Sequence, residues 1–166
     1  MSNTSRNLWL GFVVAACAVP LTAKAQEIDP GASSPDVVGS WHLESWTLAD
    51  GRPRCSEEEG GVSGMIAYTS DGHMSAQLGC AEVDTSDLSS LSPEAVAGRL
   101  SRRHFSYYGR YTLDRSAKTV THHVEGSSSV PFVGSDQVRA FVFEGPDRLV
   151  LSPAGSSQRL VWLRNH

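Results

Sequence analysis

Short runs of alternating apolar and polar residues occupy most of the chain from Val37 onward, and turn-forming residues separate them. Alternation with a period of two is typical of strands, because successive side chains point to opposite faces of a sheet. The Asp71-Gly72 pair between two such runs predicts a tight hairpin turn. The pattern predicts eight strands, at Gly39–Leu48, Val62–Thr69, His73–Leu78, Phe105–Leu113, Thr119–Glu125, Gln137–Phe143, Arg148–Leu151 and Arg159–Arg164.

One short helix is predicted in the middle of the chain, where the period changes. Ser92 suits the N-cap position, because its hydroxyl can accept a hydrogen bond from the first helical turn, and Pro93 suits the first helical position. Val96 and Leu100 are four residues apart and therefore share one face of the helix. The helix occurs once, so it is not a crossover element repeated between strands.

Most of the predicted strands join the next strand through a short connection, which favours antiparallel neighbours. The sequence therefore predicts an all-β fold, an antiparallel up-and-down barrel of about eight strands with one short helix. Closing the sheet into a barrel removes its exposed edges. A barrel of this size is just wide enough to be filled by side chains or to hold one small ligand.

The first 25 residues predict a secretory signal peptide. Arg6 supplies a positive end, Leu8–Val19 form an apolar stretch too short to cross a bilayer comfortably, and Ala23-Lys24-Ala25 fits a signal peptidase site. The alternative is a lipoprotein cleavage box at Val14-Ala15-Ala16-Cys17, which would leave a lipid anchor on Cys17. We expect an exported protein, periplasmic or secreted, with no membrane span.

Residues 26–36 lack periodicity and predict a flexible lead-in, and residues 37–166 form the predicted barrel domain. The chain has 14 basic and 18 acidic residues, a formal net charge of −4. The predicted signal removes two basic residues and no acid, which leaves a formal charge of −6. This acidic balance argues against a nucleic-acid partner and against tight binding to anionic membranes. The expected partner is a small apolar or amphipathic molecule.

Cys55 and Cys80 are the two cysteines that remain after the predicted signal. An oxidising compartment favours a disulfide between them. The alternative is that each is a separate small core residue, since unpaired cysteines are often buried.

Gly39-Ser40-Trp41 fits the Gly-x-Trp signature of lipocalins, in which the Trp packs at the closed end of the barrel under an Arg near the end of the last strand. Arg164 occupies the corresponding place here. With these residues, much of the chain resembles a lipocalin-like domain family of bacteria and fungi. The other similar segments are residues 64–75, 108–112, 119–126, 137–139 and 160–162.

The resemblance implies a cup-shaped barrel with structural roles for Gly39, Trp41 and Arg164. It implies no reaction, because the family has no single settled activity. The secretion signal and the pair Cys55 and Cys80 depart from the family pattern, which leaves a shared cellular role open.

Residues 107–126 hold the densest group of candidate site residues. Strand alternation sends His122 and His123 to opposite faces, so the two histidines cannot bind one metal ion together. His122 shares its face with Val120 and Val124, which predicts that it points into the barrel. There it is either a core histidine hydrogen-bonded to a neighbour or a site residue.

Other candidates lie on several strands. Tyr108 and Arg110 share a face and would meet a ligand only if that face is the interior. His73 follows a turn and is expected near a rim, where an exposed histidine is the alternative. Arg139 lies among aromatic residues, as an inward anchor or on the surface. The predicted ligand-binding residues are Tyr68, His73, Tyr108, Arg110, His122 and Arg139.

Three functions fit this pattern. The first is an exported protein that binds a small, mostly apolar ligand in the barrel. The second is a cofactor-free isomerase or cyclase, with His122 or Tyr108 as its acid or base. The third is a structural or stress-related envelope protein with a filled barrel. The sequence contains no Cys-x-x-Cys or His-x-His motif, no phosphate-binding loop and no nucleophile elbow, so no metal or cofactor is predicted.

Overall fold

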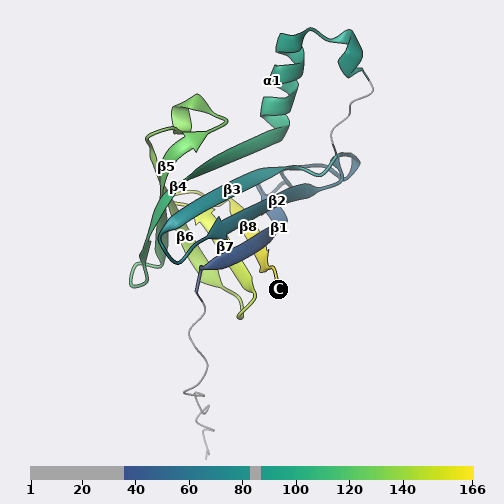
Figure 1. Cartoon of the computed structure of the whole chain (residues 1–166). Coiled ribbons are helices and arrows are strands. Elements are labelled where there is room, and N and C mark those ends of the chain that lie inside the picture. Colours follow the sequence, from purple (N-terminus) through teal and green to yellow (C-terminus); the bar gives the residue numbers. More distant parts are fainter. Residues whose placement is uncertain (1–35, 83–86) are drawn as a thin grey trace, which may run out of the picture. The chain divides into compact units, whose positions relative to one another are not determined.

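Eight antiparallel strands close into a barrel in the computed structural model, which describes residues 36–82 and 87–166 (Figure 1). The predicted signal peptide, and all of the predicted lead-in except its last residue, lie outside the described residues. Each strand pairs with its neighbours in sequence. The strands are β1 (Gly39–Thr47), β2 (Val62–Tyr68), β3 (His73–Cys80), β4 (His104–Asp114), β5 (Thr119–Ser127), β6 (Asp136–Phe143), β7 (Arg148–Pro153) and β8 (Arg159–Arg164).

Pairing between β1 and β8 closes the sheet. Trp41 lies opposite Arg164 at one end of this pair, and Thr47 lies opposite Arg159 at the other. A register shift interrupts the pairing near Leu43, as expected for a bulge that bends a strand around a barrel. The predicted up-and-down barrel is confirmed, because every strand has a partner on both sides.

The predicted helix is also present. In α1 (Pro93–Arg103), the Ser92 hydroxyl accepts a hydrogen bond from the backbone N–H of Ala95 at 3.3 Å, and proline occupies the first turn. The helix ends where β4 begins, at His104. None of the helices in the described ranges has the length and apolarity needed to cross a bilayer. The short 3-10 turns are η1 (Glu57–Glu59), η2 (Leu88–Ser90) and η3 (Val130–Phe132).

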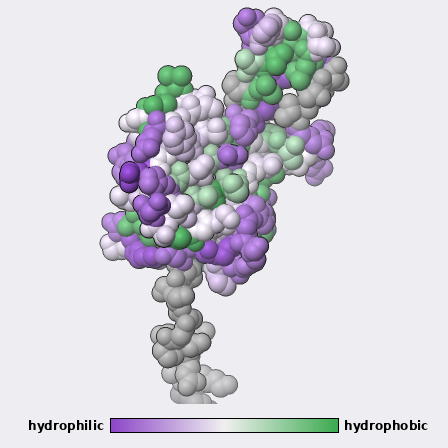
Figure 2. Space-filling model, viewed as in Figure 1, coloured by the Kyte–Doolittle hydropathy of each residue, from purple (hydrophilic) through white to green (hydrophobic). Residues whose placement is uncertain are grey.

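Alternation along the strands decides which side chains face the interior. On β5, Val120, His122 and Val124 are buried, whereas the His123 side chain between them is 39% exposed. On β3, the apolar positions are buried in the same alternating way. His122 therefore points into the barrel and His123 points out. Figure 2 shows a barrel exterior that is mainly hydrophilic or neutral on the face in view.

One end of the barrel is held by Arg164 and Trp41. The guanidinium carbon of Arg164 lies 4.0 Å from the centre of the Trp41 ring, which is a cation–π contact. Its two Nη atoms donate hydrogen bonds to the backbone carbonyls of Val38 and Asp36, at 2.9 and 2.8 Å. Gly39 has a φ of +129°, and a Cβ there would lie 2.7 Å from Arg164 Nη1. Glycine is therefore favoured at this position by the backbone conformation, and a larger residue would also displace the Arg164 guanidinium.

A disulfide joins Cys55 to Cys80, with an S–S distance of 2.10 Å. The bond that the sequence predicted is present, and the alternative of two separate core cysteines is wrong. Strand β3 runs to Cys80, two residues beyond its predicted end, because Cys80 pairs with Val62 of β2. The disulfide thus ties the segment after β1 to the end of β3.

We predict that removing this disulfide lowers stability without changing the fold. The two cysteines are 25 residues apart, and in the chain-entropy description a closed loop of this length stabilises the folded state by about 3.5 kcal/mol. The test is urea unfolding of the chain and of the double variant Cys55→Ser, Cys80→Ser, monitored by circular dichroism. A loss below about 1 kcal/mol would show that the loop is already ordered in the unfolded chain.

Candidate functional site

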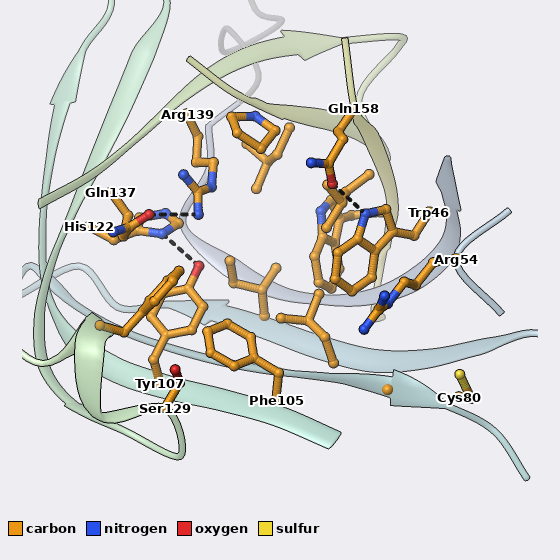
Figure 3. A pocket seen from close by; sticks show the side chains of 18 of the residues that line it. Trp46, Arg54, Cys80, Phe105, Tyr107, His122, Ser129, Gln137, Arg139 and Gln158 are labelled. Atoms are coloured by element: carbon orange, nitrogen blue, oxygen red, sulfur yellow. Dashed lines mark hydrogen bonds between the residues drawn. The ribbon is translucent and has the colours of Figure 1, made fainter. Parts of the chain in front are cut away.

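The barrel interior contains a cavity of about 740 Å³ (Figure 3). Side chains from most of the strands line it, together with residues from α1 and from the loops. This volume is within the range of pockets that hold a small organic molecule. The lining residues that the argument below uses are Trp46, Arg54, Tyr107, His122, Gln137, Arg139, Gln158 and Trp162.

The greater part of the cavity wall is aliphatic or aromatic. Ile66 and Leu78 come from neighbouring strands, and Phe105 lies edge-on to Phe132, with ring centres 4.8 Å apart. The strand period explains this composition, because most of the inward positions on the strands carry apolar residues. An apolar wall of this kind favours the burial of hydrocarbon or aromatic surface from a ligand.

A chain of three hydrogen-bonded side chains, Tyr68, His122 and Tyr107, stands out from this wall. The Tyr68 hydroxyl lies 2.8 Å from His122 Nε2, and the Tyr107 hydroxyl lies 2.9 Å from His122 Nδ1. Tyr107 and His122 line the cavity, whereas Tyr68 is buried behind them. Both ring nitrogens of the histidine are therefore occupied by tyrosines.

All three of these groups are uncharged at neutral pH, and burial stabilises their uncharged forms further. Burial lowers the pKa of His122 from 6.5 to about 3, and the positive charges of Arg139 and His123 add to this effect. Burial also raises the pKa of Tyr68 well above its usual value of 10.0. The pKa of Tyr107 is raised by burial as well, although nearby Arg139 opposes the rise. In a neutral imidazole one nitrogen donates and the other accepts, so the histidine donates to one tyrosine and accepts from the other.

Arg139 lies beside this chain on the same side of the cavity (Figure 3). Its Nη2 donates to Gln137 Oε1 at 3.3 Å, and its Nη1 donates to the backbone carbonyl of Val138 at 3.1 Å. Gln137 is held in turn, because its Nε2 donates to Ser135 Oγ at 2.8 Å. Arg139 is thus positioned by neutral groups, and its charge has no carboxylate within 4.0 Å among the described residues.

A second polar group lies across the cavity (Figure 3). Trp46 Nε1 donates to Gln158 Oε1 at 3.1 Å, which fixes the indole. The guanidinium carbon of Arg54 lies 5.3 Å from the centre of that indole ring. Arg54 is exposed, so this side of the cavity meets solvent. Arg54 precedes Cys55 of the disulfide in the chain, and Cys80 itself lines the cavity.

The ligand-binding residues predicted from the sequence fall into two groups, one at the cavity and one on the outer face of the barrel. His122 and Arg139 line the cavity, and Tyr68 supports His122 from behind. Tyr108 and Arg110 are on the outer face: Tyr108 is 57% exposed, and Arg110 is an exposed side chain near Glu125. Placing them in an interior site is therefore wrong, because the even positions of β4 point outward.

Two further placements concern the histidines. His73 is outside the cavity and pairs at the surface with Asp71, 3.2 Å away. His123 bonds outside the barrel to Asp136 at 2.7 Å and to Thr112 at 3.1 Å. Neither residue can contact a molecule held in the interior. The sequence prediction missed Tyr107, Gln137, Trp46, Arg54 and Gln158 as wall residues, although alternation alone places Tyr107 and Gln137 on inward faces.

One cluster in the described ranges has the composition of a metal site: Cys55, Glu59 and Cys80. Both sulfur atoms belong to the disulfide, so neither is available as a thiolate ligand. The carboxylate of Glu59 pairs with Arg103. The cluster is therefore a disulfide with a neighbouring ion pair, beside the cavity wall to which Cys80 and Arg103 belong.

A family model described as a lipocalin-like domain matches residues 38–163. The chain belongs to the lipocalin-like domain family. The match covers all eight strands of the barrel except Arg164, the last residue of β8, in agreement with the resemblance found in the sequence. No curated protein matches the chain.

Two solved structures are similar to this lipocalin-like barrel. One is a lipocalin-like protein from Bacteroides uniformis ATCC 8492, with 13% sequence identity and a TM-score of 0.47, over 78% of this chain and 98% of that chain. The other is a DUF4847 family protein from Bacteroides vulgatus ATCC 8482, with 12% identity and a TM-score of 0.41, over 78% of this chain and 94% of that chain.

The buried histidine predicts a specific dependence of stability on pH. The unfolded chain protonates His122 near pH 6.5, whereas the native state resists protonation down to about pH 3. The unfolded state therefore binds more protons in this window, and the free energy of unfolding falls by about 1.4 kcal/mol per pH unit as the pH decreases through it. The stability that neutral, buried His122 contributes is therefore fully present above pH 6.5 and is lost as the pH falls toward 3.

Urea unfolding of the protein and of His122→Phe between pH 4.5 and 8 measures this contribution. The variant should lose the slope and should also be less stable by about 2 kcal/mol at pH 8, because the buried Tyr68 hydroxyl loses its partner. The matched control is His123→Gln, on the outer face, which should keep the slope. If the free energy of unfolding of His122→Phe had the same dependence on pH as that of the unchanged protein, His122 would not be the source of this dependence.

Proposed function

We propose that this protein is an exported lipocalin-like protein that binds one small, mostly apolar or amphipathic molecule inside its barrel. The observation that carries the proposal is the cavity of about 740 Å³, whose wall is largely aliphatic and aromatic. Covering apolar ligand surface against such a wall is favourable, and the polar side chains of the wall can orient the ligand.

The cavity also weighs against the two alternatives. Side chains normally fill the interior of a barrel that binds no ligand, so a cavity of this size argues against a structural protein with a filled barrel. A cofactor-free isomerase or cyclase needs an acid or base that can reach its substrate. His122 has both nitrogens occupied and a pKa of about 3, which makes it a poor base, and Tyr108 faces outward.

Export has separate support. A disulfide between Cys55 and Cys80 fits an oxidising compartment. Residues 1–25 have the charge, the apolar stretch and the small residues of a secretory signal. We therefore propose a periplasmic or secreted location, with cleavage after Ala25 in preference to a lipid anchor on Cys17.

Binding is testable with a neutral apolar dye, N-phenyl-1-naphthylamine, whose fluorescence increases in an apolar cavity. We expect saturable binding of one dye per chain. Leu160→Trp fills the cavity and should weaken binding at least tenfold, because the wall and the dye would compete for the same space. The control Val142→Trp adds the same side chain to the outer face, where Val142 is 54% exposed, and should bind as the unchanged protein does. Equal binding by both variants would place the dye outside the barrel.

The location is testable by expression of the full chain in a Gram-negative host, with fractionation and mass spectrometry. We expect a periplasmic protein that begins at Gln26. Ala25→Arg should block cleavage, since signal peptidase requires a small residue there, and Cys17→Ser should have no effect. The reverse pattern, a lipid-modified chain that Cys17→Ser leaves unprocessed, would establish the lipid anchor.

A further inference from the structure

We propose that the bound molecule carries an anionic head group, and that Arg139 is the residue that pairs with it. This inference rests on the proposed binding function and adds the charge of the ligand to it. The ligand class is an amphiphile with an apolar body and one negative group at one end, for example a medium-chain carboxylate.

The first observation is the distribution of ion pairs. Ten arginines have side chains that the structure describes, and eight of them lie within 4.0 Å of an aspartate or glutamate oxygen. The two without such a partner among residues 36–82 and 87–166 are Arg54 and Arg139, and both line the cavity. Among the described arginines, those outside the cavity all have a carboxylate partner, and of the three that line it only Arg103 has one, which is Glu59.

The second observation is the chemistry of the wall itself. Its charged members are Arg54, Arg103 and Arg139, and no aspartate or glutamate is among the described residues that line it. Arg103 pairs with Glu59 outside the wall, and Arg54 is exposed at the mouth. Arg139 is the half-buried cation of the interior, beside a histidine that burial keeps neutral.

The third observation is an excess of donors over acceptors. A guanidinium has five N–H groups, and the partners of Arg139 among the described residues, Gln137, Val138 and the Tyr107 hydroxyl, are all neutral oxygens. Trp162 also lines the cavity, and its buried Nε1 has no acceptor among the described residues. The wall therefore offers unused donors to whatever occupies the space.

These three observations select an anion. A wholly apolar ligand would displace water from Arg139 and leave a partly buried cation without a counter-charge, which is unfavourable. A carboxylate supplies the missing acceptors and can accept two parallel hydrogen bonds from one guanidinium. The contacts to Gln137 and Val138 hold the guanidinium in place before the ligand arrives, so less side-chain freedom is lost on binding.

The test compares three ligands with the same ten-carbon chain and different head groups: decanoate, decanol and decylammonium. Each displaces N-phenyl-1-naphthylamine from the purified protein at neutral pH. We expect decanoate to bind at least tenfold more tightly than decanol, and decylammonium to bind most weakly. Arg139→Gln should bring decanoate and decanol to equal affinity. Arg139→Lys keeps the positive charge but loses the two parallel N–H donors of the guanidinium. It should therefore retain part of the preference for decanoate over decanol.

Two control variants locate the effect. Arg110→Gln removes a cation from the outer face of β4, and Arg115→Gln removes one that pairs with Asp36 outside the cavity, so both should keep the preference for decanoate. Circular dichroism establishes that each variant is folded. If the dye and decanol bind but decanoate binds no better, or if Arg139→Gln keeps the preference, the proposal about the anion is overturned. If neither the dye nor decanol binds, the proposed binding function fails instead.

Discussion

Closure of the sheet through β1 and β8 is the constraint on which the rest of this structure depends. An open sheet of eight strands leaves two edge strands unpaired, whereas a closed sheet has no edge and has an inside and an outside. Once the strands close, every second residue on each strand faces the same enclosed space. The cavity, its apolar wall and the inward direction of His122 and Arg139 all follow from that single pairing.

Two polar residues that line the enclosed space, His122 and Arg139, differ in how fully their polar groups are paired. His122 is fully satisfied, because a tyrosine hydroxyl bonds to each ring nitrogen, and its low pKa follows from burial next to Arg139. Arg139 is positioned but not neutralised, since its side chain bonds only to uncharged oxygens. A buried side chain whose hydrogen bonds are all made within the protein stabilises the fold. A guanidinium that has no carboxylate partner among the described residues can still pair with an anionic ligand. This difference separates the structural part of the wall from the part available to a ligand.

Alternation was sufficient to predict most of the barrel. It located all eight strands within a few residues, and it assigned His122 to the interior and His123 to the exterior. The same rule places Tyr107 inward and Tyr108 outward, so nominating Tyr108 as a site residue was an error that the pattern itself could have corrected. The strand ends were less certain, because pairing with a neighbour extends β3 to Cys80, beyond the last strongly alternating position.

The amino-acid sequence by itself determined the number of strands, their order, the single helix and the faces of the strands, because these depend on local periodicity and on short connections. Only the tertiary structure decided that Tyr68 and Tyr107, 39 residues apart in the chain, both bond to His122, and that no carboxylate of the described residues lies within 4.0 Å of Arg139. These facts depend on register around the closed barrel and on which side chains meet across its interior. A one-dimensional pattern contains no such distances, so it can nominate inward residues but cannot show which of them are already paired.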